Sequence, residues 1–275
     1  MNNRTDELHL ATLAEVAASA AKAAGTVLLD HWKNGYAIHF KGDIDLVTDA
    51  DRQAEATIVS LIRSRFPDHE ILAEEGSGSG GTASSSYRWI IDPLDGTTNY
   101  AHRYPHFAVS IAVEQAGAII VGTVYDPVLG ELFEARVGEG AYLNGRPLQV
   151  SSVDRLLRAL LCTGFPYDRK LFKPCLNRWE YFIRRSQAVR RDGSAALDVC
   201  YVAAGRFDGY WEEHLAPWDV AAGVLIVREA GGMVTGLQGQ EPDIYRGGIV
   251  ASNGLIHAEL LQGLSDADTS VHRNL

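Results

Sequence analysis

The chain has 275 residues, of which 46% are hydrophobic and 22% charged, a composition typical of a globular protein with a sizeable core. Its formal net charge is −10 and it contains no long basic block, which disfavours nucleic acid as the primary ligand because phosphate-backbone binding needs concentrated Lys and Arg. Since the cysteines form no CxxC pair and we find neither a signal-peptide pattern nor a run of transmembrane length, a reducing compartment and a cytoplasmic location are predicted.

The first half of the chain is predicted to form two helices followed by an antiparallel sheet. Apolar residues at helical spacing predict a long helix over 6–33, and Thr48 is a good N-cap for a second helix after an extended segment at 44–47. The dipeptide Asn144-Gly145 is a strong hairpin signal. Strands are predicted at 71–73, 89–91, 107–113, 118–125, 131–136, 141–143 and 147–150.

The second half alternates strands with helices, which predicts an α/β lobe. Strands are expected at 160–162, 188–190, 207–211 and 249–252, and helices at 169–185, 194–204, 217–230 and from 255. We therefore predict two lobes, an α+β lobe over 1–150 and an α/β lobe over 151–275, without an internal repeat or a separate linker.

Carboxylates and hydroxyls gather where the predicted strand at 89–91 ends. Asp92 and Asp95 follow this strand at a spacing of three, and Gly96 and Thr97 come next, at the expected start of a helix. Carboxylates hold a hard divalent cation, and a helix start offers unpaired N–H groups to a phosphate. An acidic surface turn after a core strand is the alternative interpretation.

Three further acids are candidates for the same site. Glu74 ends a strand that is expected to lie beside 89–91, so it would emerge near Asp92 unless it is a solvated loop acid. Asp51 and Asp219 lie in first turns of predicted helices, where each could either face the site or only favour the helix dipole. A Gly/Ser-rich stretch at 76–86 is expected to be a loop.

The sequence resembles the inositol monophosphatase family in three motifs that occur in the same order. These are Glu74-Glu75-Gly76, Asp92-Pro-Leu-Asp-Gly-Thr-Thr-Asn99 and Trp218-Asp-Val-Ala-Ala-Gly223. The segments 164–168 and 193–198 match the bacterial members of that family. The resemblance covers nearly the whole chain and implies a layered αβαβα sandwich of the inositol monophosphatase/fructose-1,6-bisphosphatase type, usually as a homodimer.

The resemblance also implies a magnesium centre of two or three ions. The first ion would be bound by Glu74, Asp92 and the carbonyl of Leu94, and the second by Asp92, Asp95 and Asp219. Glu74 would help to hold a third ion through waters. Lithium inhibition is implied as well.

The resemblance implies two further roles, namely orientation of the attacking water and binding of the substrate. Asp51 and Thr97 would pair by a hydrogen bond, and Thr97 and Glu74 would orient the attacking water. Ser194 is alternatively a simple N-cap. The implied substrate contacts are the backbone N–H groups of Gly96 and Thr97 for phosphate oxygens, and Gly193, Ser194, Ala195 and Glu212 for the hydroxyls of the organic part.

The predicted reaction is Mg²⁺-dependent hydrolysis of a polyol or sugar phosphate monoester, first of all myo-inositol 1-phosphate, by metal-activated water. Histidinol phosphate, fructose 1,6-bisphosphate and 3′-phosphoadenosine 5′-phosphate are alternative substrates, and Asp192 together with Glu212 could favour a polyol or an amine-bearing substrate. A regulatory role bound to the transcription machinery is a different possibility. For that role Arg184, Arg185, Arg190 and Arg191 could form a partner surface, although a solvated or dimer-interface patch is the preferred interpretation.

Overall fold

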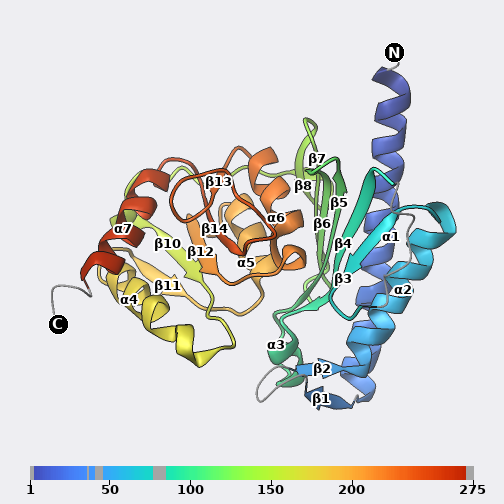
Figure 1. Ribbon diagram of the computed structural model, residues 1–275, viewed down its shortest axis with the longest axis horizontal. Coiled ribbons are helices and arrows are strands. Elements are labelled where there is room, and N and C mark those ends of the chain that lie inside the picture. Colours follow the sequence, from blue (N-terminus) through green and yellow to red (C-terminus); the bar gives the residue numbers. More distant parts are fainter. Residues whose placement is uncertain (1–2, 36, 41–45, 77–84, 271–275) are drawn as a thin grey trace.

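The computed structural model describes residues 3–35, 37–40, 46–76 and 85–270, and it has the predicted five layers (Figure 1). Helices α1 (Asn3–Asn34) and α2 (Asp49–Arg65) cover one face of a seven-stranded sheet. Helices α5 (Ala195–Ala203) and α6 (Pro217–Glu229) lie between that sheet and a five-stranded one. Helices α4 (Phe172–Ile183) and α7 (His257–Ser270) cover the far face of the smaller sheet. The αβαβα prediction is confirmed.

The large sheet has the order β3-β4-β5-β6-β7-β8-β9, in which β3 is parallel to β4 and all other neighbours are antiparallel. Its strands are β3 (Glu70–Ala73), β4 (Tyr87–Asp95), β5 (Ala108–Gln115), β6 (Ala118–Asp126), β7 (Glu131–Arg136), β8 (Gly140–Leu143) and β9 (Arg146–Pro147). The parallel pairing puts the ends of β3 and β4 side by side, as predicted for Glu74 and Asp92.

The small sheet has the order β11-β10-β12-β14-β13. Its strands are β10 (Leu160–Thr163), β11 (Ala188–Arg190), β12 (Gly209–Glu213), β13 (Met233–Thr235) and β14 (Gly248–Ser252). The remaining elements are the hairpin of β1 (Ile38–Phe40) and β2 (Leu46–Thr48), the short helix α3 (Thr97–Ala101), and the 3₁₀ turns η1 (Leu156–Arg158) and η2 (Arg169–Leu171). The predicted division into 1–150 and 151–275 stays a prediction.

Alternation along the central strands explains how one sheet serves two cores. Trp89 and Ile91 of β4 pack towards α1 and α2, whereas Ile90 between them packs towards α5 and α6. On the latter face Gly122 permits an unusually close approach, because a Cβ there would lie 2.6 Å from the carbonyl oxygen of Ala222 in α6. The helix that carries Asp219 is therefore seated directly on the large sheet.

Helix α1 corrects one expectation from the sequence. Over Glu7–Asn34 it is long and apolar enough to cross a membrane by length and composition alone, so the prediction that no run reaches that length is wrong. Its small-residue face is nevertheless fully buried within the protein, as Ala17, Ala20 and Ala24 pack with α2 and the large sheet. One face of α1 is therefore part of the core, and 39% of its apolar window is buried inside the protein.

Other local predictions need adjustment. Strand β4 does not end at Asp92 but continues to Asp95 through Pro93, with a register shift against β5 between the two aspartates. A proline removes a ladder donor and is accommodated at such a bulge. The strand expected at 147–150 is only β9 (Arg146–Pro147), and β1 and β13 were not predicted. Residues 44–45 and 77–84 of the predicted extended segment and loop lie outside the described residues.

Candidate active site

Three carboxylates converge at the end of β4 opposite the start of α6. Asp92 and Asp95 stand on either side of the bulge, and Asp219 lies in the first turn of α6. One carboxylate oxygen from each lies within 4.8 Å of the others. The fold thus brings together three of the predicted metal ligands. Leu94, whose backbone carbonyl is also a predicted ligand, lies between Asp92 and Asp95 in the sequence and is 1% exposed.

The carboxylates of this cluster repel one another when they are ionised. Burial, followed by the carboxylates of Glu74, Asp95 and Asp219, raises the pKa of Asp92 well above its usual range. Burial also raises the pKa of Asp219 well above its usual range, with Asp95 and Glu74 adding to the effect, and raises the pKa of Asp95 to about 6. Hard carboxylate oxygens gathered at one point fit Mg²⁺, which would offset this repulsion when bound.

Hydrogen bonds orient the aspartates of β4. The amide of Leu94 donates to Asp92 Oδ1 at 2.9 Å. Asp95 Oδ2 accepts from the hydroxyl of Ser194 at 2.5 Å and from the amide of Ala196 at 2.8 Å. Ser194 occupies the N-cap position of α5 but makes no side-chain cap bond. Its alternative interpretation as a simple cap is therefore wrong: the hydroxyl positions Asp95.

Asp219 and Glu74 complete the acidic wall. Asp219 Oδ2 accepts from the amide of Ala216 at 2.7 Å, which fixes it at the helix start. Glu74 directly follows β3, and its amide donates to the carbonyl of Ile91 in β4 at 3.2 Å. Its charge raises the pKa of Asp92 and of Asp219, so it is close enough to act on the cluster, although the group of oxygens within 4.8 Å comprises only Asp92, Asp95 and Asp219. The prediction that Glu74 emerges near Asp92 is confirmed.

Asp51 and Thr97 meet beside the cluster. The hydroxyl of Thr97 lies 3.0 Å from the carbonyl oxygen of Leu94 and 3.4 Å from Asp51 Oδ1, both as acceptors. Asp51 Oδ2 in turn accepts from the amide and hydroxyl of Thr48, the N-cap of α2, at 2.8 and 2.5 Å. Burial raises the pKa of Asp51 to about 7 against the opposing effect of these bonds. Asp51 therefore belongs to the site as well as to the helix cap.

The turn before α3 requires glycine. Gly96 has φ +92°, and a Cβ there would lie 3.0 Å from the carbonyl oxygen of His106 and 3.3 Å from that of Gly193. This close approach brings the predicted phosphate-binding turn against the predicted substrate segment. The predicted contacts of the Gly96 and Thr97 amides to phosphate stay predictions.

The opposite wall carries the residues predicted for the organic part of a substrate. Gly193 has φ +88°, and a Cβ there would lie 2.7 Å from an Arg191 guanidinium nitrogen. Glu212 of β12 accepts a hydrogen bond from the hydroxyl of Tyr210, and burial raises the pKa of Glu212 to about 8. A Cβ on Gly164 would collide with the Glu212 carboxylate, so glycine makes room for it. The charge of Asp95 also raises the pKa of Glu212, so the two carboxylates interact electrostatically.

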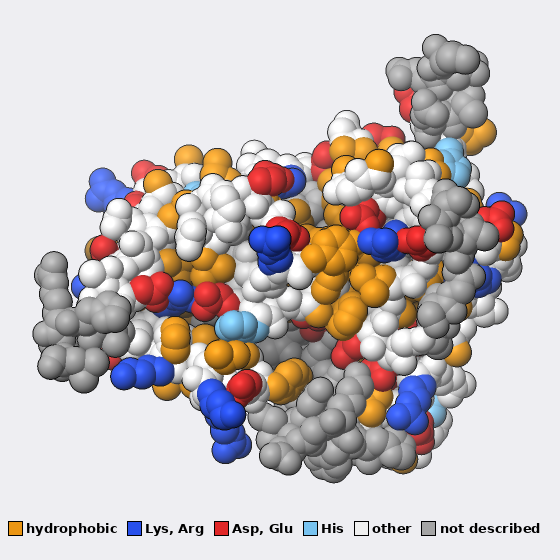
Figure 2. Space-filling view, in the orientation of Figure 1, with side chains coloured by type: hydrophobic (Ala, Val, Ile, Leu, Met, Phe, Trp, Pro, Cys, Tyr) orange, Lys and Arg blue, Asp and Glu red, His pale blue; other side chains and the backbone are white. Residues whose placement is uncertain are grey.

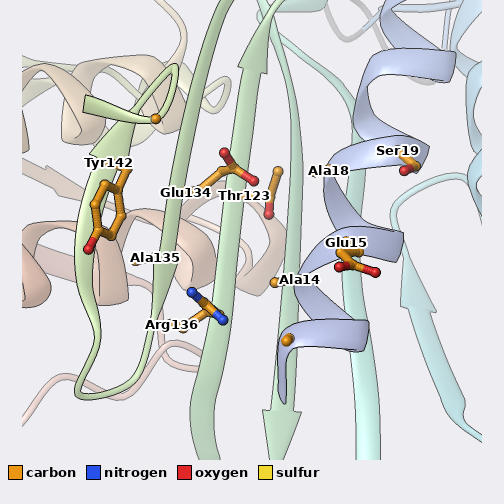
Figure 3. Close-up of a pocket in the computed structure, with 11 residues that line it drawn as sticks. Ala14, Glu15, Ala18, Ser19, Thr123, Glu134, Ala135, Arg136 and Tyr142 are labelled. Atoms are coloured by element: carbon orange, nitrogen blue, oxygen red, sulfur yellow. The ribbon is translucent and has the colours of Figure 1, made fainter. Parts of the chain in front are cut away.

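Two other features bear on the assignment. A cavity of about 540 Å³ lies between α1 and β6–β8 and is lined partly by Glu15, Thr123, Glu134 and Arg136 (Figure 3). It holds none of the predicted site residues. Lys and Arg side chains are dispersed over the face shown in Figure 2 rather than gathered in one broad patch. Neither feature competes with the carboxylate cluster as the functional centre.

The fold and the site define a layered α/β protein with a carboxylate cluster that is a candidate site for divalent cations, and comparisons with known proteins identify its family. Residues 9–269 match the model of the inositol monophosphatase family. The chain is 49% identical to an inositol-1-monophosphatase of Synechocystis over 258 residues, which are 93% of this chain and 90% of that protein. It is 44% identical to the Nus factor SuhB of Escherichia coli K12 over 254 residues, 91% of this chain and 95% of that protein.

Solved structures give the same result. The extragenic suppressor protein suhB of Bartonella henselae superposes with a TM-score of 0.88 at 40% identity, covering 92% of this chain and 98% of that one. The inositol monophosphatase of Anabaena superposes with a TM-score of 0.85 at 44% identity, covering 94% and 97%. The chain therefore belongs to the inositol monophosphatase family, as its motifs indicated.

Proposed function

We propose that this protein is a Mg²⁺-dependent phosphatase that hydrolyses a polyol or sugar phosphate monoester, first of all myo-inositol 1-phosphate, by direct attack of water. The observation that carries the proposal is the convergence of Asp92, Asp95 and Asp219 within 4.8 Å, beside the hydrogen-bonded Thr97 and Asp51. A cation-binding module alone would not need the Thr97 pair. The relatives named inositol monophosphatase support the same reaction class.

The cations would be held by Glu74, Asp92, the Leu94 carbonyl, Asp95 and Asp219. Bound Mg²⁺ supplies positive charge for the phosphate dianion and lowers the pKa of water. Without such cations the clustered carboxylates would repel the substrate. Their hydrogen bonds to Leu94, Ala196 and Ala216 hold the ligands in place before any substrate arrives.

The protein's own groups would orient the attacking water. Thr97 Oγ1 has one proton and two acceptors, the Leu94 carbonyl and Asp51. When the Leu94 carbonyl is engaged elsewhere, Asp51 remains as the acceptor, and the Thr97 oxygen then offers its lone pairs to a proton of water. Glu74 would hold the same water from the other side. Because no protein nucleophile is invoked, the reaction needs no covalent intermediate.

The test of substrate class is phosphate release with Mg²⁺ and with EDTA from myo-inositol 1-phosphate, histidinol phosphate, fructose 1,6-bisphosphate and 3′-phosphoadenosine 5′-phosphate. We expect myo-inositol 1-phosphate to lead in kcat/KM by about tenfold, equivalent to about 1.4 kcal/mol of transition-state binding. If a different substrate leads, the proposed mechanism stands and the proposed substrate changes. Insensitivity of this release to lithium would count against the inositol branch.

A regulatory role is a second candidate because several relatives are named Nus factor SuhB. Of the arginines proposed for a partner surface, Arg184 pairs with Glu180 at 2.7 Å and Arg185 lies over the ring of Tyr181. Arg190 and Arg191 are exposed. Binding to purified RNA polymerase that survives Asp92→Asn would support this role independently of catalysis. Light scattering of the same preparation would test the predicted homodimer.

A further inference from the structure

A second group of metal-ligating side chains lies outside the set proposed for catalysis. His106 lies two residues before β5, Asp192 lies between β11 and α5, and Asp198 lies in the first turn of α5. One ligand-type atom of each, an imidazole nitrogen and two carboxylate oxygens, lies within 4.8 Å of the other two. The three residues come from two segments more than eighty residues apart in the sequence, so no local sequence motif predicts the cluster.

Two atoms of this cluster are buried without a hydrogen-bond partner among the described residues, namely His106 Nε2 and Asp198 Oδ1. Asp198 is 1% exposed and His106 9% exposed, so bulk water does not satisfy them. Buried polar atoms are normally paired, and an unpaired buried carboxylate oxygen is costly. The two atoms form an ion pair with each other only when His106 is protonated. With the imidazole neutral and its proton on Nδ1, both atoms present lone pairs at a single point.

The spacing of these atoms fits a shared ion better than a direct bond. His106 Nε2 and Asp198 Oδ1 are 3.5 Å apart. A charge-assisted hydrogen bond between them would be about 2.7–2.9 Å long. Two ligands placed about 2.0–2.1 Å from one tetrahedral Zn²⁺ are about 3.3–3.4 Å apart.

The backbone frame of the cluster is already fixed. Asn99 Nδ2 donates to the carbonyl oxygens of both His106 and Asp192, each at 2.8 Å, and so ties the two ligand-bearing segments together. The His106 ring packs edge-on against Tyr201, with centroids 5.8 Å apart. Asp192 is only half-buried, which leaves a route for an ion from solvent. These contacts hold the ligands near one another without an ion.

We propose that His106, Asp192 and Asp198 form a cation site separate from the catalytic cluster, and that this site takes a borderline transition metal, with Zn²⁺ as the reference ion. Imidazole nitrogen is a good ligand for Zn²⁺ and a poor one for Mg²⁺, which demands oxygen. The two carboxylates neutralise the ion's charge. A cation here would join the segment before β5 to α5, the helix whose Ala196 amide holds Asp95.

The test is calorimetric titration of the full chain with Zn²⁺ in saturating Mg²⁺, so that the catalytic carboxylates are already occupied. We expect one Zn²⁺ per chain for the wild type. Asp192→Asn and His106→Asn should weaken this event at least about tenfold, because even the loss of an outer-shell partner costs about 10–100-fold in metal affinity. Asp154→Asn, a matched change at an exposed carboxylate of the same half, should leave the event unchanged.

Asp92→Asn separates this site from the catalytic one. It should impair the catalytic centre and retain the Zn²⁺ event, so the outcome does not depend on whether the protein proves to be a phosphatase. If Asp192→Asn binds Zn²⁺ as the wild type does, or if Asp92→Asn abolishes the event, the proposal is overturned. Asp192 is half-buried, so this variant decides the matter even where His106→Asn fails to fold.

Discussion

Replacing Asp92 with Asn should stabilise the metal-free protein at alkaline pH although it removes a proposed ligand. The amide side chain retains an oxygen to accept the hydrogen bond from Leu94, which is 2.9 Å long. It removes a negative charge from a site where Glu74, Asp95 and Asp219 already oppose one another. The substitution is close to isosteric, so packing changes little while the charge changes by one.

The sign of the pH dependence follows from the raised pKa of Asp92. In the folded, metal-free chain this carboxyl holds its proton to higher pH than in the unfolded chain. Its stabilising contribution is fully present below the unfolded pKa of 3.8 and is lost as the pH rises through the folded value. Asn does not titrate, so the stability of the variant should fall less steeply with rising pH.

The size of the effect can be worked from the spacing of the carboxylates. Two charges separated by the 4.8 Å that bounds the Asp92–Asp95–Asp219 cluster repel by about 3 kcal/mol at an effective dielectric constant of about 20. Relief of one such interaction should raise the melting temperature by roughly 6 °C, at about 2 °C per kcal/mol for a chain of this size. Mg²⁺ at about 1,000 times its Kd should reverse the order, since it would stabilise only the wild type, by about 4.1 kcal/mol.

Scanning calorimetry of both proteins, with EDTA and with Mg²⁺ at about pH 5 and about pH 8, measures these differences. In EDTA, the melting temperature of the variant relative to the wild type should be higher at the higher pH. In Mg²⁺, the melting temperature of the variant should be below that of the wild type. A difference that is independent of pH in EDTA would refute the assignment of mutual repulsion to this cluster. An equal response of both proteins to Mg²⁺ would refute Asp92 as a ligand.

Three further substitutions probe other parts of the structure. Thr97→Val removes the hydroxyl shared with Asp51 and should lower kcat by about 100-fold with little change in KM, as steady-state kinetics would show. Glu212→Gln should lower kcat/KM about tenfold for myo-inositol 1-phosphate but not for p-nitrophenyl phosphate, which has no hydroxyls to bind; equal losses would contradict a substrate contact. Gly122→Ala places a Cβ 2.6 Å from the Ala222 carbonyl oxygen and should cost about 1–3 kcal/mol in urea unfolding, whereas unchanged stability would contradict that close contact.

Much of the site was predictable because its residues occupy ends of elements that hydrophobic patterning locates. The apolar strand before Asp92 and the helix signal at Asp219 marked positions where polar side chains point to an edge of the fold. Parallel pairing of β3 with β4 then brought Glu74 to the same edge. Thr48 was recognised as an N-cap from local chemistry alone, and the structure confirms it.

The remainder depended on tertiary contacts that no local pattern encodes. The bulge that carries β4 past Pro93 is stabilised by pairing with β5, which overrides the usual strand-ending effect of proline. The hydrogen bond from Ser194 to Asp95 joins residues 99 positions apart in the sequence. From the sequence alone, a helix N-cap was an equally reasonable interpretation of Ser194. His106 was missed altogether, since a single histidine beside a strand carries no signal until the fold places it against Asp198.

The most direct measurement is Mg²⁺-dependent release of phosphate from myo-inositol 1-phosphate by the wild type and by Asp92→Asn, with folding of both verified by circular dichroism. The carboxylate cluster predicts release by the wild type that EDTA abolishes and Mg²⁺ restores. It also predicts a loss of at least about 100-fold in the variant, equivalent to about 2.7 kcal/mol. Release that persists in EDTA, or a folded variant as active as the wild type, would contradict a phosphatase centred on Asp92, Asp95 and Asp219.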